Sequence, residues 1–311
     1  MKIVIVGPGA MGCLLGAFLS KSKEEIWMLD RSPQRAEKIQ EKGIKVQGVS
    51  GDWQAQVKAT AQAKEIGAAD LVIITVKSYD TKDTLKAIQP LLGERTLILT
   101  LQNGLGNIEI ISELSSPERV LGGITNQGAT LLDAASIRHA GTGDTVIGRL
   151  DGKISVEMRS IRELFNKTGL ETRISKDIKA LLWSKLIINV GINALTAITR
   201  LPNGKLLEFE GTRKILEAAV TEAVRVAKRK RIKIIYDDPL SKVEAVCQAT
   251  AGNISSMLQD VLRGKHTEID FINGVIVRQA QGLGIPTPVN SVLTNLVKAI
   301  EASYATQISK I

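Results

Sequence analysis

The chain is poor in cysteine and in long apolar runs. Its two cysteines, Cys13 and Cys247, form no metal-binding or redox motif, so we predict no metal site and a reducing, cytoplasmic location. No apolar run approaches the ~20 residues of a membrane span. The N-terminal MKIVIVGPGAMG has no signal-peptide cleavage pattern and is typical of a strand. We therefore expect no membrane partner.

Aromatic residues are also scarce, at 3% of 311 residues, while the net charge is +9. A positive charge suggests anionic partners, which range from phosphates and carboxylates to nucleic acid. The densest basic run, KRKRIK at residues 228–233, ends a predicted helix, where cations complement the helix dipole. Because almost no aromatic side chains accompany the basic ones, we expect no nucleic-acid partner. With 44% hydrophobic and 23% charged residues, the chain is long enough for two globular domains.

The N-terminus carries the clearest motif. The β-branched segment Lys2–Val6 predicts a buried parallel strand, and Gly7-Pro8-Gly9-Ala10-Met11-Gly12 follows before a helix through about Leu19. This is G-x-G-x-x-G between a strand and a helix, as a dinucleotide-binding fold requires. Gly7 permits the tight turn, Gly9 lets the backbone approach a pyrophosphate, and Gly12 lets helix and strand pack closely.

The two residues that follow the second predicted strand, Ile26–Leu29, favour different cofactors. Asp30 lies 18 residues after Gly12, near the usual spacing for a contact with the ribose 2′-hydroxyl of NADH. Arg31 is suited to pair with the 2′-phosphate of NADPH instead. These two residues leave the choice between the cofactors open.

Further α/β patterns follow. Leu71–Val76 and Thr96–Leu101 predict buried parallel strands that end at Lys77 and at Gln102-Asn103-Gly104, and ligands bind at such carboxyl ends. A plain turn is the alternative for Asn103-Gly104. The glycine-punctuated stretch Gly128–Gly148 predicts antiparallel strands at the edge of the same sheet, with His139 in a structural role.

The C-terminal part is predicted to be helical. We place the domain boundary near Gly169, which gives an N-terminal domain of residues 1–168 and a helical domain of residues 169–311. A short strand is predicted near Glu171–Ile174. The predicted helices are Ser155–Lys167, Ile178–Thr199, Arg213–Lys230, Ser241–Arg263, Glu268–Gln281 and Val289–Ala305.

One of these helices carries a polar stripe. Lys185, Asn189 and Asn193 are spaced by four within an otherwise apolar segment, so they advance only ~80° around the helix and share one narrow strip. Buried polar groups need partners. They form either a structural hydrogen-bond network between helices or the wall of a cleft, where the lysine donates a proton and the carboxamides orient a small polar ligand.

A second polar cluster lies further on, with Ser256 in the predicted helix Ser241–Arg263 and Glu268 in the first turn of the next. Thr267 is expected as the N-cap of that helix, with Asp270 completing a capping box. Compensation of the helix dipole alone would explain Glu268.

Together these motifs resemble the ketopantoate reductase (2-dehydropantoate 2-reductase) family over the whole chain. The resemblance rests on GPGAMG at 7–12, Lys77, QNG at 102–104, GG-x-T at 122–125 and GTG at 141–143. It continues with W-x-K-L-x-x-N-x-x-x-N at 183–193, Asn203, SSMLQD at 255–260 and TEIDFING at 267–274.

The resemblance implies an α/β fold with an N-terminal Rossmann-type domain and an all-helical domain like the C-terminal domain of 6-phosphogluconate dehydrogenase. It implies NADPH-dependent reduction of 2-dehydropantoate, a small 2-oxo acid, to (R)-pantoate, on the route to pantothenate and coenzyme A. Asp30 keeps NADH as the alternative cofactor. A related 2-oxo acid or hydroxy acid dehydrogenase, or an inactive NADPH-binding sensor, is the alternative function. A homodimer is compatible with the sequence.

Residue roles follow from the resemblance by position. Lys185 resembles the proton donor, with Glu268 beside the nicotinamide and tuning the lysine. Asn189, Asn193, Asn203 and Ser256 resemble substrate ligands, and Asn103 is implied to contact both substrate and cofactor. The implied cofactor contacts beyond the glycine motif are Arg31, Lys77 and the backbone of Ala129. The contact of Asp30 is predicted from its spacing after Gly12 instead.

Overall fold

The computed structural model describes residues 1–307, which form two compact units. The first contains Met1–Gln102 and Asn107–Ile178, and the second contains Asn103–Gly106 and the helical residues from Lys179 onward. Our boundary at residues 168/169 therefore differs from this division. The reason is that the strand at Thr172–Ile174 pairs with Thr145–Ile147 and so extends the sheet of the first unit.

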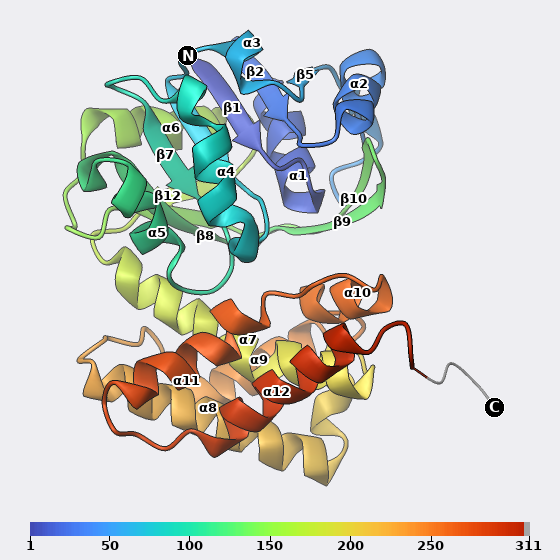
Figure 1. Ribbon diagram of the computed structural model, residues 1–311, viewed down its shortest axis with the longest axis vertical. Helices are drawn as coiled ribbons and strands as arrows, with labels where there is room; N and C mark the ends of the chain where they lie inside the picture. Colours follow the sequence, from blue (N-terminus) through green and yellow to red (C-terminus); the bar gives the residue numbers. More distant parts are fainter. Residues whose placement is uncertain (308–311) are drawn as a thin grey trace. The chain divides into compact units, whose positions relative to one another are not determined.

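The first unit is built on an eight-stranded sheet (Figure 1). In sheet order its strands are β12 (Thr172–Ile174), β11 (Thr145–Gly148), β8 (Val120–Thr125), β7 (Leu97–Thr100), β6 (Leu71–Ile74), β1 (Lys2–Val6), β2 (Glu25–Leu29) and β5 (Lys58–Thr60). All neighbouring pairs are parallel except β11 with β8. Central strands such as β6 are buried at every residue, as continuous apolar sequences predict for a sheet covered on both faces.

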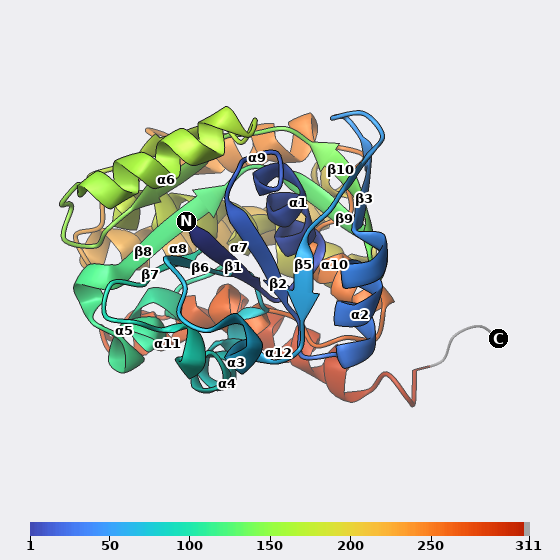
Figure 2. The ribbon, with the colours of Figure 1, turned by 90° about the horizontal axis from the view of Figure 1, so that it is seen from above.

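Helices cover both faces of this sheet. In Figure 2, α4 and α5 lie on one face, and α1 and α6 lie on the other. The helices are α1 (Ala10–Leu19), α2 (Pro33–Lys42), α3 (Ala63–Ile66), α4 (Thr81–Ala87), α5 (Asn107–Leu114) and α6 (Val156–Lys167), with 3-10 turns η1 (Ser78–Asp80), η2 (Gln89–Leu91) and η3 (Pro117–Arg119). The order of strands and helices is doubly wound and confirms the predicted Rossmann-type α/β fold.

A second, four-stranded sheet corrects one prediction. Its order is β4 (Trp53–Ala55), β3 (Ile44–Gly48), β10 (Ser136–Gly141) and β9 (Gly128–Asp133). We expected all strands of Gly128–Gly148 at the edge of the main sheet, but only β11 joins it. Instead, β10 pairs with β3 and β9 pairs with β10. This sheet packs against α1, where Phe18 makes edge-on ring contacts with Trp53 and His139. His139 is buried and bonded to Gln127, in agreement with a structural role.

The second unit is helical and is organised around α7 (Ile178–Thr199), whose bounds match the prediction. Its other elements are η4 (Asn203–Leu207), α8 (Glu210–Arg229), α9 (Pro239–Ala249), α10 (Ser256–Leu262), η5 (Ile269–Phe271), α11 (Asn273–Gln281) and α12 (Pro288–Ala302). By length and composition α7 could cross a membrane, but 67% of its most apolar window is buried within the protein. Its apolar side chains form a core with those of α8, α9, α11 and α12.

Two predicted helices are interrupted. Ser241–Arg263 divides into α9 and α10, because the hydroxyl of Ser255 caps α10 by accepting from the amide of Leu258 at 3.1 Å. Glu268–Gln281 divides into η5 and α11, and the expected capping box is absent: Thr267 accepts from Ile269, while the Asp270 carboxylate lies 2.7 Å from the Lys298 ammonium.

Candidate functional site

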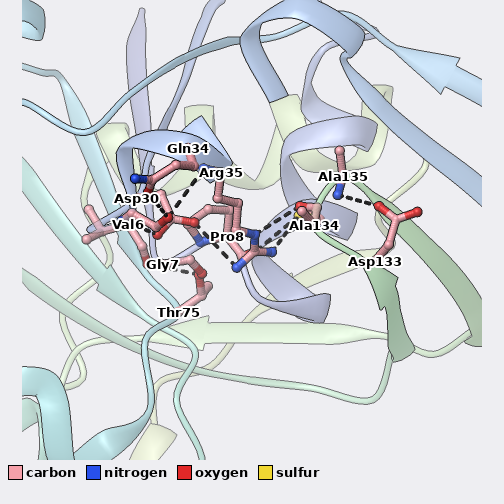
Figure 3. Close-up of polar contacts among 12 residues, drawn as sticks. Val6, Gly7, Pro8, Asp30, Gln34, Arg35, Thr75, Asp133, Ala134 and Ala135 are labelled. Carbon is pink, nitrogen blue, oxygen red and sulfur yellow. Dashed lines mark hydrogen bonds and ion pairs between the residues drawn. The ribbon is translucent and has the colours of Figure 1, made fainter. Parts of the chain in front are cut away.

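The glycine motif forms a cradle of backbone groups between β1 and α1. The turn begins at Gly7, which has φ +84°, a conformation that favours glycine. A Cβ on Gly12 would lie 2.6 Å from both the Gly7 carbonyl oxygen and the Thr75 hydroxyl, so only glycine lets the helix approach the sheet this closely. Thr75 secures the turn by donating to the Gly7 carbonyl at 2.8 Å (Figure 3).

Gly9 differs from these two glycines because the space beside it is open. A Cβ there would meet nothing closer than the Gly7 carbonyl oxygen, at 4.0 Å. Gly9 is also the N-cap of α1, and no side chain caps the helix. The first amide groups of α1 therefore face this space together with the positive end of the helix dipole. An open cradle of free amides fits the pyrophosphate of a dinucleotide.

Four other residues predicted to contact the cofactor lie in the same unit. Asp30 and Arg31 follow β2; Asp30 is buried and pairs with Arg35, whereas Arg31 is exposed and lies 3.5 Å from Asp80. Lys77 is half-buried beyond the carboxyl end of β6. Ala129 lies in β9, opposite His139. Their contact with a cofactor stays a prediction.

Lys185 and Glu268 come together in the second unit. Glu268 is 5% exposed, and it precedes the short turn η5 without a cap bond from its side chain. Lys185 is half-buried, and desolvation lowers the pKa of its ammonium group from 10.5 to about 8, while the Glu268 carboxylate opposes part of this shift. The pair therefore keeps a lysine charged at neutral pH yet able to release its proton near that pH.

Asn103 joins this pair from a distant part of the sequence. Its side-chain amide donates to the Glu268 carboxylate at 3.5 Å. The turn is held in place because Leu105 N donates to the Phe271 carbonyl at 3.1 Å, and Gly104, with φ +82°, packs against the same carbonyl with no room for a Cβ. Asn103-Gly104 is thus a turn, and it also positions Asn103 beside Glu268.

The stripe on α7 continues from Lys185 through Asn189, which is half-buried, to Asn193, which is 6% exposed. Among residues 1–307, neither carboxamide forms a hydrogen bond within the protein. A structural network between helices would have used these groups. Their availability favours the alternative, in which they bind a ligand.

The remaining predicted substrate ligands are Asn203 and Ser256. Asn203, in η4, donates from its side chain to Thr250 at 2.9 Å and from its backbone to the Asn253 carbonyl at 3.0 Å. The loop after α9 thus holds the side-chain nitrogen of Asn203, while its Oδ1 is buried and accepts no hydrogen bond from any residue in 1–307. Ser256 is exposed at the start of α10, next to the cap Ser255, which bonds to Thr196 of α7 at 2.6 Å.

The sequence interpretation missed Arg35. This residue lies in the first turn of α2, where a cation opposes the helix dipole, and that position was the available signal. It also missed Thr75, whose hydroxyl secures the glycine turn and which no periodicity in the sequence marks. Thr196, which flanks the polar stripe of α7, bonds to the cap of α10.

A dinucleotide cradle on a doubly wound sheet, followed by a helical unit with a half-buried lysine of lowered pKa, defines the class of two-domain nicotinamide-dependent oxidoreductases. Comparison with known proteins narrows the class. The family model for ketopantoate reductase PanE/ApbA matches residues 3–152, and the model for its C-terminal domain matches residues 177–301. The chain belongs to the ketopantoate reductase PanE/ApbA family.

Individual relatives support this assignment. The 2-dehydropantoate 2-reductase of Halobacterium salinarum is 35% identical over 302 residues, which cover 96% of this chain and 98% of that protein. A PanE/ApbA family ketopantoate reductase from Ralstonia eutropha superposes with a TM-score of 0.91 at 33% identity, covering 98% of this chain and 100% of that one. D-mandelate dehydrogenase, solved with NADH and anilino(oxo)acetate, gives 0.90 at 28% identity, with the same coverage of both chains.

Proposed function

We propose that the protein reduces 2-dehydropantoate to (R)-pantoate with NADPH, in the cytoplasmic synthesis of pantothenate and coenzyme A. The observation that carries this proposal is the Lys185–Glu268–Asn103 group on the same unit as two unpaired carboxamides, in a chain of this family. When bound, the nicotinamide supplies the hydride that adds to the C2 ketone carbon of the substrate.

The chain's own residues supply the proton and the orientation. Negative charge grows on the ketone oxygen as the hydride adds, and the Lys185 ammonium stabilises it and donates the proton that completes the alcohol. Lys185 then regains a proton from solvent. Glu268 favours the charged form of the lysine, and Asn103, by donating to Glu268, orients that carboxylate.

The carboxamides of Asn189 and Asn193 orient the carboxylate and hydroxyl of the substrate, and Ser256 contacts its carboxylate end. Asn203 contributes its side-chain oxygen, which accepts no hydrogen bond within residues 1–307. An analogue that lacks the carboxylate or the hydroxyl would leave these carboxamides without partners, so the site should discriminate strongly against it.

The alternative substrate is an aryl 2-oxo acid, because D-mandelate dehydrogenase shares the fold closely. The test is the loss of absorbance at the band of the reduced nicotinamide, with 2-dehydropantoate or benzoylformate as substrate and NADPH or NADH as cofactor. We expect fast turnover with 2-dehydropantoate and NADPH. Faster turnover of benzoylformate than of 2-dehydropantoate would overturn the proposed substrate. Binding of NADPH without turnover of any oxo acid would indicate a sensor.

A further inference from the structure

Arg35 joins three segments of the first unit. Its side chain is 22% exposed. The Nε donates to the Ala134 carbonyl at 2.9 Å, one terminal nitrogen donates to the Pro8 carbonyl, and the other lies 3.4 Å from the Asp30 carboxylate (Figure 3). A single guanidinium thus connects the glycine motif, the end of β2 and the turn between β9 and β10.

Helix stability does not explain this arginine. Arg35 is the third residue of α2, where the helix dipole disfavours a cation, and no acidic residue compensates it in that turn. The balancing charge comes from Asp30 instead, before the helix begins. The contacts of the guanidinium group, and not the stability of α2, therefore explain why an arginine stands at position 35.

The same contacts turn the carboxylate of Asp30 into the protein. Its side chain is 9% exposed. Its Oδ1 accepts from the Ser32 amide at 2.9 Å, and its Oδ2 is buried, without a hydrogen bond from any residue in 1–307, and faces Arg35. An acid at this place ordinarily accepts from the ribose 2′-hydroxyl and disfavours a 2′-phosphate. Here the charge is balanced and one oxygen is inaccessible.

Arg31 is arranged in the opposite way. Its side chain is 85% exposed, and its partner among residues 1–307 is Asp80, at 3.5 Å. Exposed pairs of this kind contribute little, so an incoming phosphate could displace Asp80 at small cost. The end of β2 therefore offers a neutralised acid beside an accessible cation.

We propose that Arg35 is a specificity-determining residue: by burying and neutralising Asp30, it permits a 2′-phosphate at the end of β2 and so sets the preference for NADPH over NADH. The proposal rests on the NADPH dependence proposed above. Without Arg35, the carboxylate of Asp30 is released toward the ribose, where it accepts from a 2′-hydroxyl and repels a 2′-phosphate.

The test measures dissociation constants for NADPH and NADH from nicotinamide fluorescence, with no oxo acid present. We compare the unchanged protein with Arg35→Ala, Asp30→Asn and the double variant. Arg35→Ala should lower the NADPH preference roughly tenfold or more, because an uncompensated carboxylate then faces the phosphate. Asp30→Asn should keep the preference, and adding it to Arg35→Ala should restore it.

Two further variants distinguish a change in cofactor preference from a loss of folding. Arg35→Lys keeps the positive charge near Asp30 but loses the several N–H donors of the guanidinium group. It should retain the preference for NADPH over NADH. Lys38→Ala, on the same helix and paired with Asp133 at 3.4 Å, is the matched control and should change nothing. Melting temperatures show whether each variant is folded.

Equal weakening of NADPH and NADH in Arg35→Ala, without rescue by Asp30→Asn, would overturn the proposal and leave Arg35 as a structural clamp. An unchanged preference in a folded Arg35→Ala would overturn it as well. Because the readout is binding, an unchanged protein that prefers NADPH but fails to reduce 2-dehydropantoate would overturn only the proposed activity.

Discussion

The nucleotide cradle and the lysine group are built in different ways. The cradle is one continuous hexapeptide, Gly7–Gly12. It presents backbone amides, and its glycines have no Cβ that would fill the space beside them or keep α1 from the sheet. The lysine group uses side chains, and its Asn103–Glu268 bond spans 165 residues of sequence. A cradle of backbone groups depends on local conformation, whereas the lysine group depends on how distant segments pack.

This difference predicts how substitutions separate binding from chemistry. Changes in the cradle should alter nucleotide affinity, and changes in the lysine group should alter turnover while the nucleotide still binds. The following predictions test that separation, from the largest effect to the smallest.

Lys185→Ala should lower kcat roughly 100-fold or more, the usual scale for a lost general acid, with the dissociation constant for NADPH unchanged. The measurement is steady-state kinetics together with a fluorescence titration of the nucleotide. Lys179→Ala is the matched control, since Lys179 is exposed on the same helix and should be indifferent. A loss of less than about fivefold would remove Lys185 from its role.

Gly9→Ala and Gly12→Ala should separate two functions of the cradle. Gly12→Ala forces a methyl group against the Gly7 carbonyl and should destabilise the fold by about 1–3 kcal/mol as well as weaken nucleotide binding. Gly9→Ala meets only open space, so it should leave the Tm unchanged and weaken the nucleotide alone.

The control for the cradle variants is Gly211→Ala, in α8, where a Cβ also meets nothing within 4 Å. This variant should lower neither the Tm nor the affinity for the nucleotide. A large drop in Tm for Gly9→Ala would show that Gly9 supports the fold and would contradict the cradle interpretation.

The pH dependence of reduction should follow Lys185. Its pKa of about 8 lies below the usual value of 10.5, so the lysine is protonated and active below pH 8, and kcat/KM should fall about tenfold per pH unit above it. Glu268→Gln removes the carboxylate that raises the pKa, so the decline should begin at lower pH. An inflection near 10.5, or one that Glu268→Gln does not move, would contradict this coupling.

Ser255 and Ser256 are neighbours that should behave differently. Ser255→Ala removes the cap of α10 and its bond to Thr196, which should cost about 1 kcal/mol of unfolding free energy. Ser256→Ala should leave the Tm unchanged, because this serine is exposed, and should raise KM for the oxo acid several-fold. Thermal melts and saturation kinetics on both variants decide the matter, and a reversed pattern would exclude Ser256 as a ligand.

The sequence predicted most of the fold, because its signals are local. The buried strands, the turn at Gly7–Gly12 and the exact span of α7 follow from apolar runs, glycine placement and periodicity within a few residues. The interruptions within Ser241–Arg263 and Glu268–Gln281 did not follow. They depend on caps and turns held by other segments, such as Ser255 bonded to Thr196.

By itself, the sequence determined the dinucleotide motif, the stripe of Lys185, Asn189 and Asn193, and the resemblance to a family, since each is carried by residues at fixed spacing. Only the tertiary structure placed Glu268 and Asn103 beside one another and paired Asp30 with Arg35 rather than leaving it exposed. The physical reason is that charge and burial belong to an environment. The environment of Asp30 is made by α2, the glycine motif and the turn between β9 and β10, and no spacing rule joins those segments.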